Sequence, residues 1–80
     1  MDLAKLKSQL QTEVDSAFLY ERIAEIQSDN NLVRVLRSLA EIENGHAIHM
    51  LNKVKEVESN YTMPSPSSRA KFQLKLGKIF

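Results

Sequence analysis

The sequence has no cysteine, which excludes several ways of stabilising so short a chain. A domain of this size buries only about 60% of its unfolded surface, so it often depends on disulfides, a metal or self-association. Without cysteine, disulfides, thiolate zinc sites and cysteine-ligated iron centres are excluded, and a reducing compartment is favoured. Self-association and a metal bound by other ligands remain.

Long hydrophobic runs are also absent. No stretch approaches the roughly 18 to 20 apolar residues of a membrane span, and the first ten residues lack the apolar core of a signal peptide. Hydrophobic residues make up 42% of the chain and charged residues 26%, as is usual for globular domains. We therefore expect a soluble cytoplasmic domain.

Glycine and proline are scarce, with two residues of each, and neither interrupts the first part of the chain. Apolar residues recur there at intervals of three and four, which predicts a long amphipathic helix from Leu3 to the polar cluster at 28–31. The predicted buried stripe consists of Leu3, Leu6, Leu10, Glu13, Ala17, Tyr20 and Ala24, flanked by Val14 and Phe18.

The same rhythm predicts a second helix that ends near Ser59 and Asn60. Gly45 lies inside it at a cost of about 1 kcal/mol relative to Ala, for which a close helix crossing, tight packing beside the polar residues and chance are all explanations. The predicted stripe consists of Leu32, Leu36, Leu39, Glu43, His46, Met50, Lys53 or Val54, and Val57, widened by Val35 and Ile42.

Residues 61–68 form a Pro/Ser linker, and residues 69–80 read as a short basic amphipathic helix, capped by Ser67 or Ser68 and interrupted at Gly77. Residues 1–58 carry seven Lys/Arg against ten Asp/Glu, a net charge of −3, whereas residues 59–80 carry four basic residues and no acid. Such a segment suits a membrane surface or a partner helix better than nucleic acid. Its apolar side consists of Phe72, Leu76, Ile79 and Phe80, and because the sequence stops on this run we expect a further domain beyond it.

Two long helices joined by a short turn predict an all-α antiparallel hairpin over residues 1–60. A hairpin buries one stripe on each helix and leaves the rest exposed to water. We therefore expect two hairpins to form a four-helix bundle as a two-fold homodimer, with the third helix packed on the bundle or swapped between chains.

Three polar residues interrupt the apolar stripes: Glu13 on the first helix, and Glu43 and His46 on the second. A carboxylate in a dry interface costs several kcal/mol unless it is protonated, paired or bound to a cation. From the hairpin midpoint, Glu13 lies about 16 residues back, and Glu43 and His46 lie about 14 and 17 residues on, so all three reach one level. The pattern predicts a buried metal site.

Glu43 and His46 form a Glu-x-x-His motif, which places both side chains on one helical face. With a Glu from the facing helix, they reproduce half of a di-iron carboxylate centre, in which two helices each supply a Glu and two others each supply Glu-x-x-His. A two-fold axis would complete the set, since four carboxylates balance two divalent cations.

The stretches EVDSAFLYERIAE (13–25) and EIENGHA (41–47) resemble the rubrerythrin branch of the ferritin-like superfamily, over roughly residues 3–58. The resemblance implies a ferritin-like bundle that binds two iron ions per homodimer and oxidises Fe(II), as a ferroxidase or peroxidase-type enzyme. Glu13 and Glu43 would be its terminal and bridging carboxylates and His46 its terminal imidazole, all three catalytic. Manganese or zinc could substitute. Tyr20 is either a core aromatic or a support for a ligand carboxylate, and His49 a flanking residue or a second support.

The chain also departs from rubrerythrins, because it has one hairpin and no cysteine-ligated iron domain. Its tail, PSPSSRAKFQLKLGKIF, is similar to the segment that joins a ferritin-like domain to a vacuolar-iron-transporter-type membrane domain. That similarity leaves a second possibility, an iron-sensing or iron-delivery module for a linked or partner transporter. A third possibility is a metal-free helical dimerisation module, with the three polar residues as ordinary surface groups.

Overall fold

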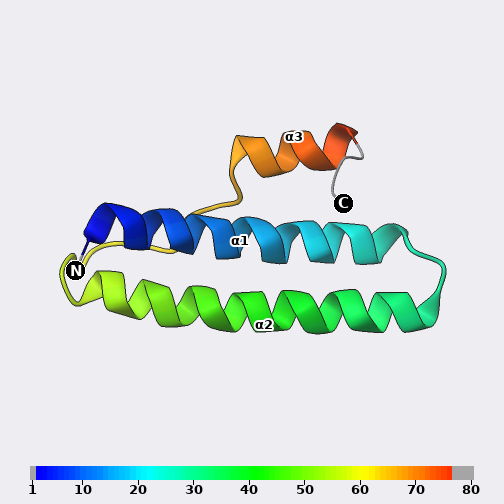
Figure 1. Cartoon of the computed structure of the whole chain (residues 1–80), viewed down its shortest axis with the longest axis horizontal. Helices are drawn as coiled ribbons and strands as arrows, with labels where there is room; N and C mark the ends of the chain where they lie inside the picture. Colours follow the sequence, from blue (N-terminus) through cyan, green and yellow to red (C-terminus); the bar gives the residue numbers. More distant parts are fainter. Residues whose placement is uncertain (1, 77–80) are drawn as a thin grey trace.

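The computed structural model describes residues 2–76, which form three α-helices and no β-strand. Helices α1 (Leu3–Ile26) and α2 (Asn30–Lys55) make an antiparallel hairpin, and the short helix α3 (Ser68–Leu76) lies against α1 (Figure 1). The molecule is elongated, with extents of 43 × 23 × 18 Å. The predicted hairpin and third helix are confirmed, whereas the predicted interruption at Gly77 and the apolar residues Ile79 and Phe80 lie outside the described residues.

Both long helices begin at an aspartate that caps them. Asp2 accepts a hydrogen bond from the Lys5 backbone N–H at 3.1 Å, and Asp29 accepts from the N–H groups of Asn31 and Leu32 at 2.9 and 3.3 Å. These bonds satisfy amides that have no partner inside a helix. The connection between α1 and α2 is therefore only residues 27–29.

Helix α2 ends at Lys55, four residues before the predicted end at Ser59. Just after the end of α2, the chain contacts α1: the Lys7 ammonium lies 2.8 Å from a Glu58 carboxylate oxygen and 4.9 Å from the centre of the Tyr61 ring. These contacts hold the chain against α1 as it leaves the helix, so the polar Ser59-Asn60 pair falls in a turn.

The predicted stripe of α1 is buried or half-buried throughout, but the stripe predicted for α2 is partly wrong. Leu36 and Val54 face α1, together with Ala40 and Ala47, which are 0% and 1% exposed. Leu32, Leu39, His46, Lys53 and Val57 are exposed instead. The apolar surface of α2 is wide enough that the side with Leu39 or the side with Ala40 could face α1. The side with the small alanines faces α1 because it lets the two helices approach more closely.

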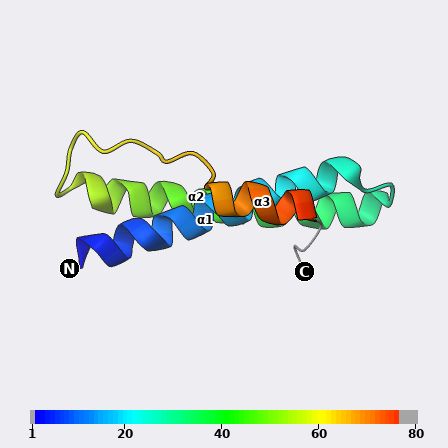
Figure 2. The same ribbon diagram turned by 90° about the horizontal axis from the view of Figure 1, so that it is seen from above.

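Helix α3 packs on the side of α1 away from α2 (Figures 1 and 2). Ser67 caps it, since its hydroxyl oxygen accepts from the Ala70 N–H at 3.1 Å. The Asp15 carboxylate accepts from the Ser67 N–H at 2.8 Å and from its O–H at 2.6 Å. Gln11 donates to both Asp15 and the Ser65 carbonyl, each at 2.9 Å, so the helix start is fixed to α1 of the same chain.

Two further expectations are decided by the fold. A Cβ added at Gly45 would meet no atom within 4 Å, so no close helix crossing within the described chain explains this glycine. Among residues 2–76, no helix combines the length and the apolar character needed to cross a membrane.

Candidate metal centre

Glu13 of α1 and Glu43 and His46 of α2 meet at one level of the hairpin, as their distances from the turn predict. Each offers one ligand-type atom, and these three atoms lie within 4.8 Å of one another. The group sits between two apolar clusters, one around Leu10 and Val54 and the other around Ile23 and Leu36. Packing on both sides thus fixes the helix positions that carry the three side chains.

The three side chains form a connected polar group. His46 Nδ1 lies 3.0 Å from Glu43 Oε1 and 3.5 Å from Glu13 Oε2. The side chains of Glu13 and Glu43 are 19% and 23% exposed, whereas that of His46 is 57% exposed. The carboxylates are therefore sheltered between the helices, and the imidazole lies at the edge of a face of the hairpin that is exposed to water. We call this face the open face.

Glu13 is the unusual member of the group. Its Oε2 atom is buried and has no hydrogen-bond partner within the described residues. Burial raises the pKa of this carboxyl above its ordinary value of 4.5, and the neighbouring Glu43 raises it further, while His46 acts in the opposite direction. A buried anionic oxygen without a donor is costly, and a bound cation would remove that cost.

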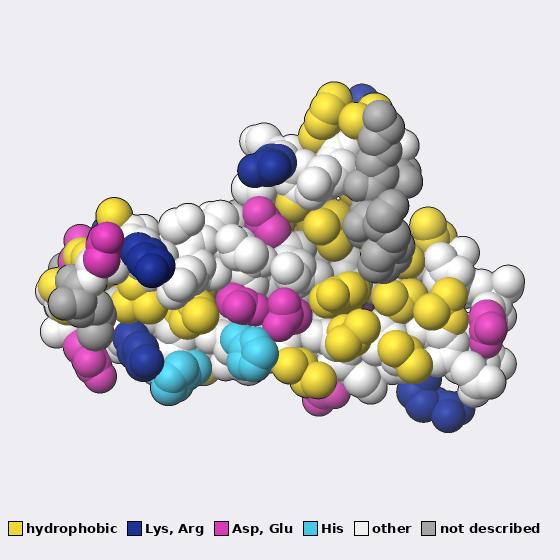
Figure 3. Space-filling view, in the orientation of Figure 1, with side chains coloured by type: hydrophobic (Ala, Val, Ile, Leu, Met, Phe, Trp, Pro, Cys, Tyr) yellow, Lys and Arg dark blue, Asp and Glu magenta, His cyan; other side chains and the backbone are white. Residues whose placement is uncertain are grey.

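Figure 3 shows the open face of the hairpin, with acidic and histidine side chains near its middle and hydrophobic side chains on both sides. Four residues of α2 contribute large apolar groups at intervals of three and four. We call this set the α2 stripe: Leu32, Val35, Leu39 and Ile42, which are 40%, 54%, 36% and 53% exposed. His46 continues the same spacing, so the stripe leads directly to the candidate ligands.

The two residues predicted to support the ligands are placed differently. Tyr20 is half-buried against the cluster of Ile23, Ala24 and Leu36. His49 is exposed and does not belong to the converging group. No hydrogen bond joins either residue to Glu13, Glu43 or His46 within residues 2–76, so their supporting roles stay predictions.

One important carboxylate was not predicted from the sequence. Asp15, two residues after Glu13, accepts the two hydrogen bonds from Ser67 that anchor α3, and a third from Gln11 on its own helix. Nothing in the local sequence pointed to Ser67, which lies 52 residues away.

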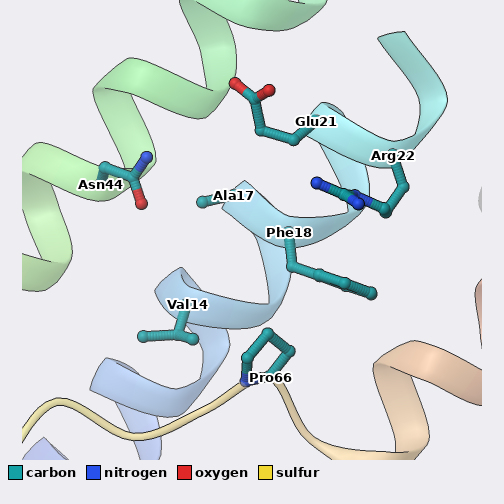
Figure 4. A pocket seen from close by; sticks show the side chains of 7 residues that line it. All are labelled: Val14, Ala17, Phe18, Glu21, Arg22, Asn44 and Pro66. Atoms are coloured by element: carbon teal, nitrogen blue, oxygen red, sulfur yellow. The ribbon is translucent and has the colours of Figure 1, made fainter. Parts of the chain in front are cut away.

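A separate shallow cavity of about 220 Å³ lies where the linker residue Pro66 passes α1 (Figure 4). Arg22, which lines this cavity, is already paired, since it binds Glu25 at 3.0 Å and lies over the Phe18 ring at 5.7 Å. None of the three candidate ligands lines it. Its lining consists of Val14, Ala17, Phe18, Glu21, Arg22, Asn44 and Pro66.

The donor set of two carboxylates and one imidazole suits iron, manganese or zinc, and the buried oxygen without a donor fits a cation at this point. Comparison of the chain with family models, curated proteins and solved structures finds no match. The rubrerythrin resemblance therefore stays a prediction from the motifs, and the chemistry of the group has to be inferred from its own residues.

Proposed function

We propose that two copies of this chain pack across their open faces into a ferritin-like four-helix bundle, and that the completed site binds and oxidises Fe(II). In this proposal Glu13, Glu43 and His46 of each copy hold two metal ions at the shared interface. The buried Glu13 oxygen without a donor carries the proposal, because it lies where two other ligand-type atoms converge.

Self-association is supported by the incomplete ligand set of one chain and by the exposed apolar side chains of the α2 stripe. Three ligands from one chain are too few to enclose two metal ions, whereas four carboxylates and two imidazoles match a di-iron carboxylate site. The α2 stripe beside His46 leaves four large apolar side chains in water. A contiguous apolar surface of this kind marks an interaction site, and covering it with a second copy would also shelter His46.

Metal binding is supported by the charges. The raised pKa of Glu13 reflects its burial and the repulsion between neighbouring carboxylates, and a divalent cation relieves both. Binding would release any proton held by Glu13 and would require a neutral His46 ring. Fe(II) is then the substrate, and it gives its electrons to oxygen or peroxide while the carboxylates stabilise the Fe(III) product.

The decisive experiment combines metal analysis with solution mass on protein loaded with Fe(II) under anaerobic conditions. The proposal expects a dimer that carries about two iron ions, and faster loss of Fe(II) after air is admitted than in buffer alone. Glu13→Gln and His46→Ala should lose both the metal and the rate enhancement, whereas Glu41→Gln, an exposed carboxylate of α2, serves as the matched control.

A metal-free dimerisation module is the second candidate, and the exposed α2 stripe favours it independently of any metal. It predicts a dimer with no bound iron, and a thermal stability that Fe(II) does not change. A dimer that binds iron without oxidising it would instead indicate the sensing or delivery role.

A further inference from the structure

Helix α3 has two apolar sides, and within residues 2–76 only one of them packs against the rest of the chain. On the side facing α1, Ala70 is 1% exposed, and Gln73 and Leu74 are half-buried. On the outward side, Phe72 is 60% exposed and Leu76 is 51% exposed. Residues four apart lie on one helical face, so these two large side chains form a continuous outward pair.

Cations surround this outward pair. Lys71 and Lys75 form a neighbouring row at the same i,i+4 spacing, and Arg69 lies three residues before Phe72. All three are exposed, and residues 59–76 contain no acidic residue. The hairpin, by contrast, has more acidic than basic residues. The outward face of α3 is therefore apolar at its centre and positive around it.

This face has a fixed orientation. The hydrogen bonds of Ser67 to Asp15 tie the start of α3 to α1, and the buried Ala70 lies one turn further on. Figure 1 shows α3 on the side of α1 away from α2, so its outward face points away from the hairpin. The candidate metal ligands lie on a different face of the hairpin, and a partner of α3 would not cover them.

The size and charge of the described face favour a lipid surface as its partner. Within residues 68–76 the face is about 13 Å long and about 10 Å wide, and a footprint of that order is far below the roughly 800 Å² that each partner buries in a specific protein complex. A lipid surface sets no such minimum, because apolar side chains enter the headgroup region while cations bind phosphates over a broad area.

We propose that the outward face of α3 binds the surface of anionic phospholipid bilayers, with Phe72 and Leu76 inserted between headgroups and Arg69, Lys71 and Lys75 against their phosphates. This binding is independent of the metal site. It is peripheral, and electrostatic attraction gives it a dependence on ionic strength.

Vesicle co-sedimentation of the 80-residue chain tests this proposal. At low salt the chain should sediment with phosphatidylcholine vesicles that contain about one third phosphatidylglycerol, and not with phosphatidylcholine alone. Lys71→Gln with Lys75→Gln should weaken partitioning about 25-fold, at about five-fold for each charge. Phe72→Ser should weaken it as well, and added salt should release the protein.

A control variant, Lys5→Gln with Lys55→Gln, makes the same change in net charge at exposed positions of the hairpin and should bind as the wild type does. Circular dichroism confirms that each variant is folded. Equal binding to neutral vesicles, equal weakening by the control variant, or no co-sedimentation at all would overturn the proposal. The last result would direct attention to an acidic protein surface instead.

Discussion

Two carboxylates on α1, only two residues apart, differ in almost every respect. Asp15 faces α3, and its two oxygens accept hydrogen bonds from the Ser67 N–H and O–H and from Gln11. Glu13 faces α2, where its buried Oε2 accepts no hydrogen bond from residues 2–76 and its pKa is raised. The difference separates a carboxylate whose two oxygens are satisfied by hydrogen bonds from one whose buried oxygen has only the His46 ring nearby, at 3.5 Å.

The strongest way to sharpen this comparison is to supply a cation. At a free metal concentration about 100 times the dissociation constant, binding should stabilise the folded state by about 2.7 kcal/mol. Thermal unfolding with and without Fe(II) or Mn(II) measures this gain. Glu13→Gln should abolish it, whereas Asp15→Ala should retain it. A gain that survives in Glu13→Gln would show that the metal binds elsewhere.

Removing the anchoring carboxylate should cost almost as much. Asp15→Ala leaves the Ser67 amide and hydroxyl without their acceptor, and hydrogen bonds to a charged group contribute about 1.5 to 3 kcal/mol. We expect faster amide hydrogen exchange in α3 and a lower urea midpoint for the metal-free protein. Glu13→Gln, as the matched variant, should be neutral or stabilising without metal. Destabilisation of equal size in both variants would erase the distinction between the two carboxylates.

The pH dependence of the metal-free protein tests the electrostatics of Glu13 alone. Because its folded-state pKa lies above the ordinary value of 4.5, the folded state binds more protons than the unfolded state in the window between the two values. The contribution of Glu13 to stability should therefore fall as the pH rises from 4.5 through the folded pKa. The melting temperature of the wild type minus that of Glu13→Gln should show this decline. A rising difference would mean that His46 governs Glu13 more than burial and Glu43 do.

The smallest predicted change in stability is that of a substitution at Gly45, which lies between Glu43 and His46. Gly45→Ala should stabilise the chain by about 0.5–1 kcal/mol, because a Cβ there meets no neighbour within 4 Å and alanine favours the helix. Urea denaturation measures the change, and the solution mass should stay the same. A loss of stability or of self-association would instead place a second copy close to Gly45.

Much of the hairpin follows from the sequence. The spacing of apolar residues at intervals of three and four predicts both long helices. The polar cluster that contains Asp29 predicts the turn, because an aspartate before a helix caps its first amides. The common level of Glu13, Glu43 and His46 also follows, since antiparallel helices rise equally per residue from a known turn. Neither inference needs contacts between distant residues.

Only the tertiary structure decided which side of α2 faces α1. The helix carries adjacent apolar stripes, and periodicity alone does not choose between Leu39 with His46 and Ala40 with Ala47. Packing against α1 favours the alanines, which leaves His46 at the edge and the α2 stripe in water. The role of Asp15 was likewise decided by a contact with Ser67, 52 residues away, because a long-range hydrogen bond leaves no periodic signal in the sequence.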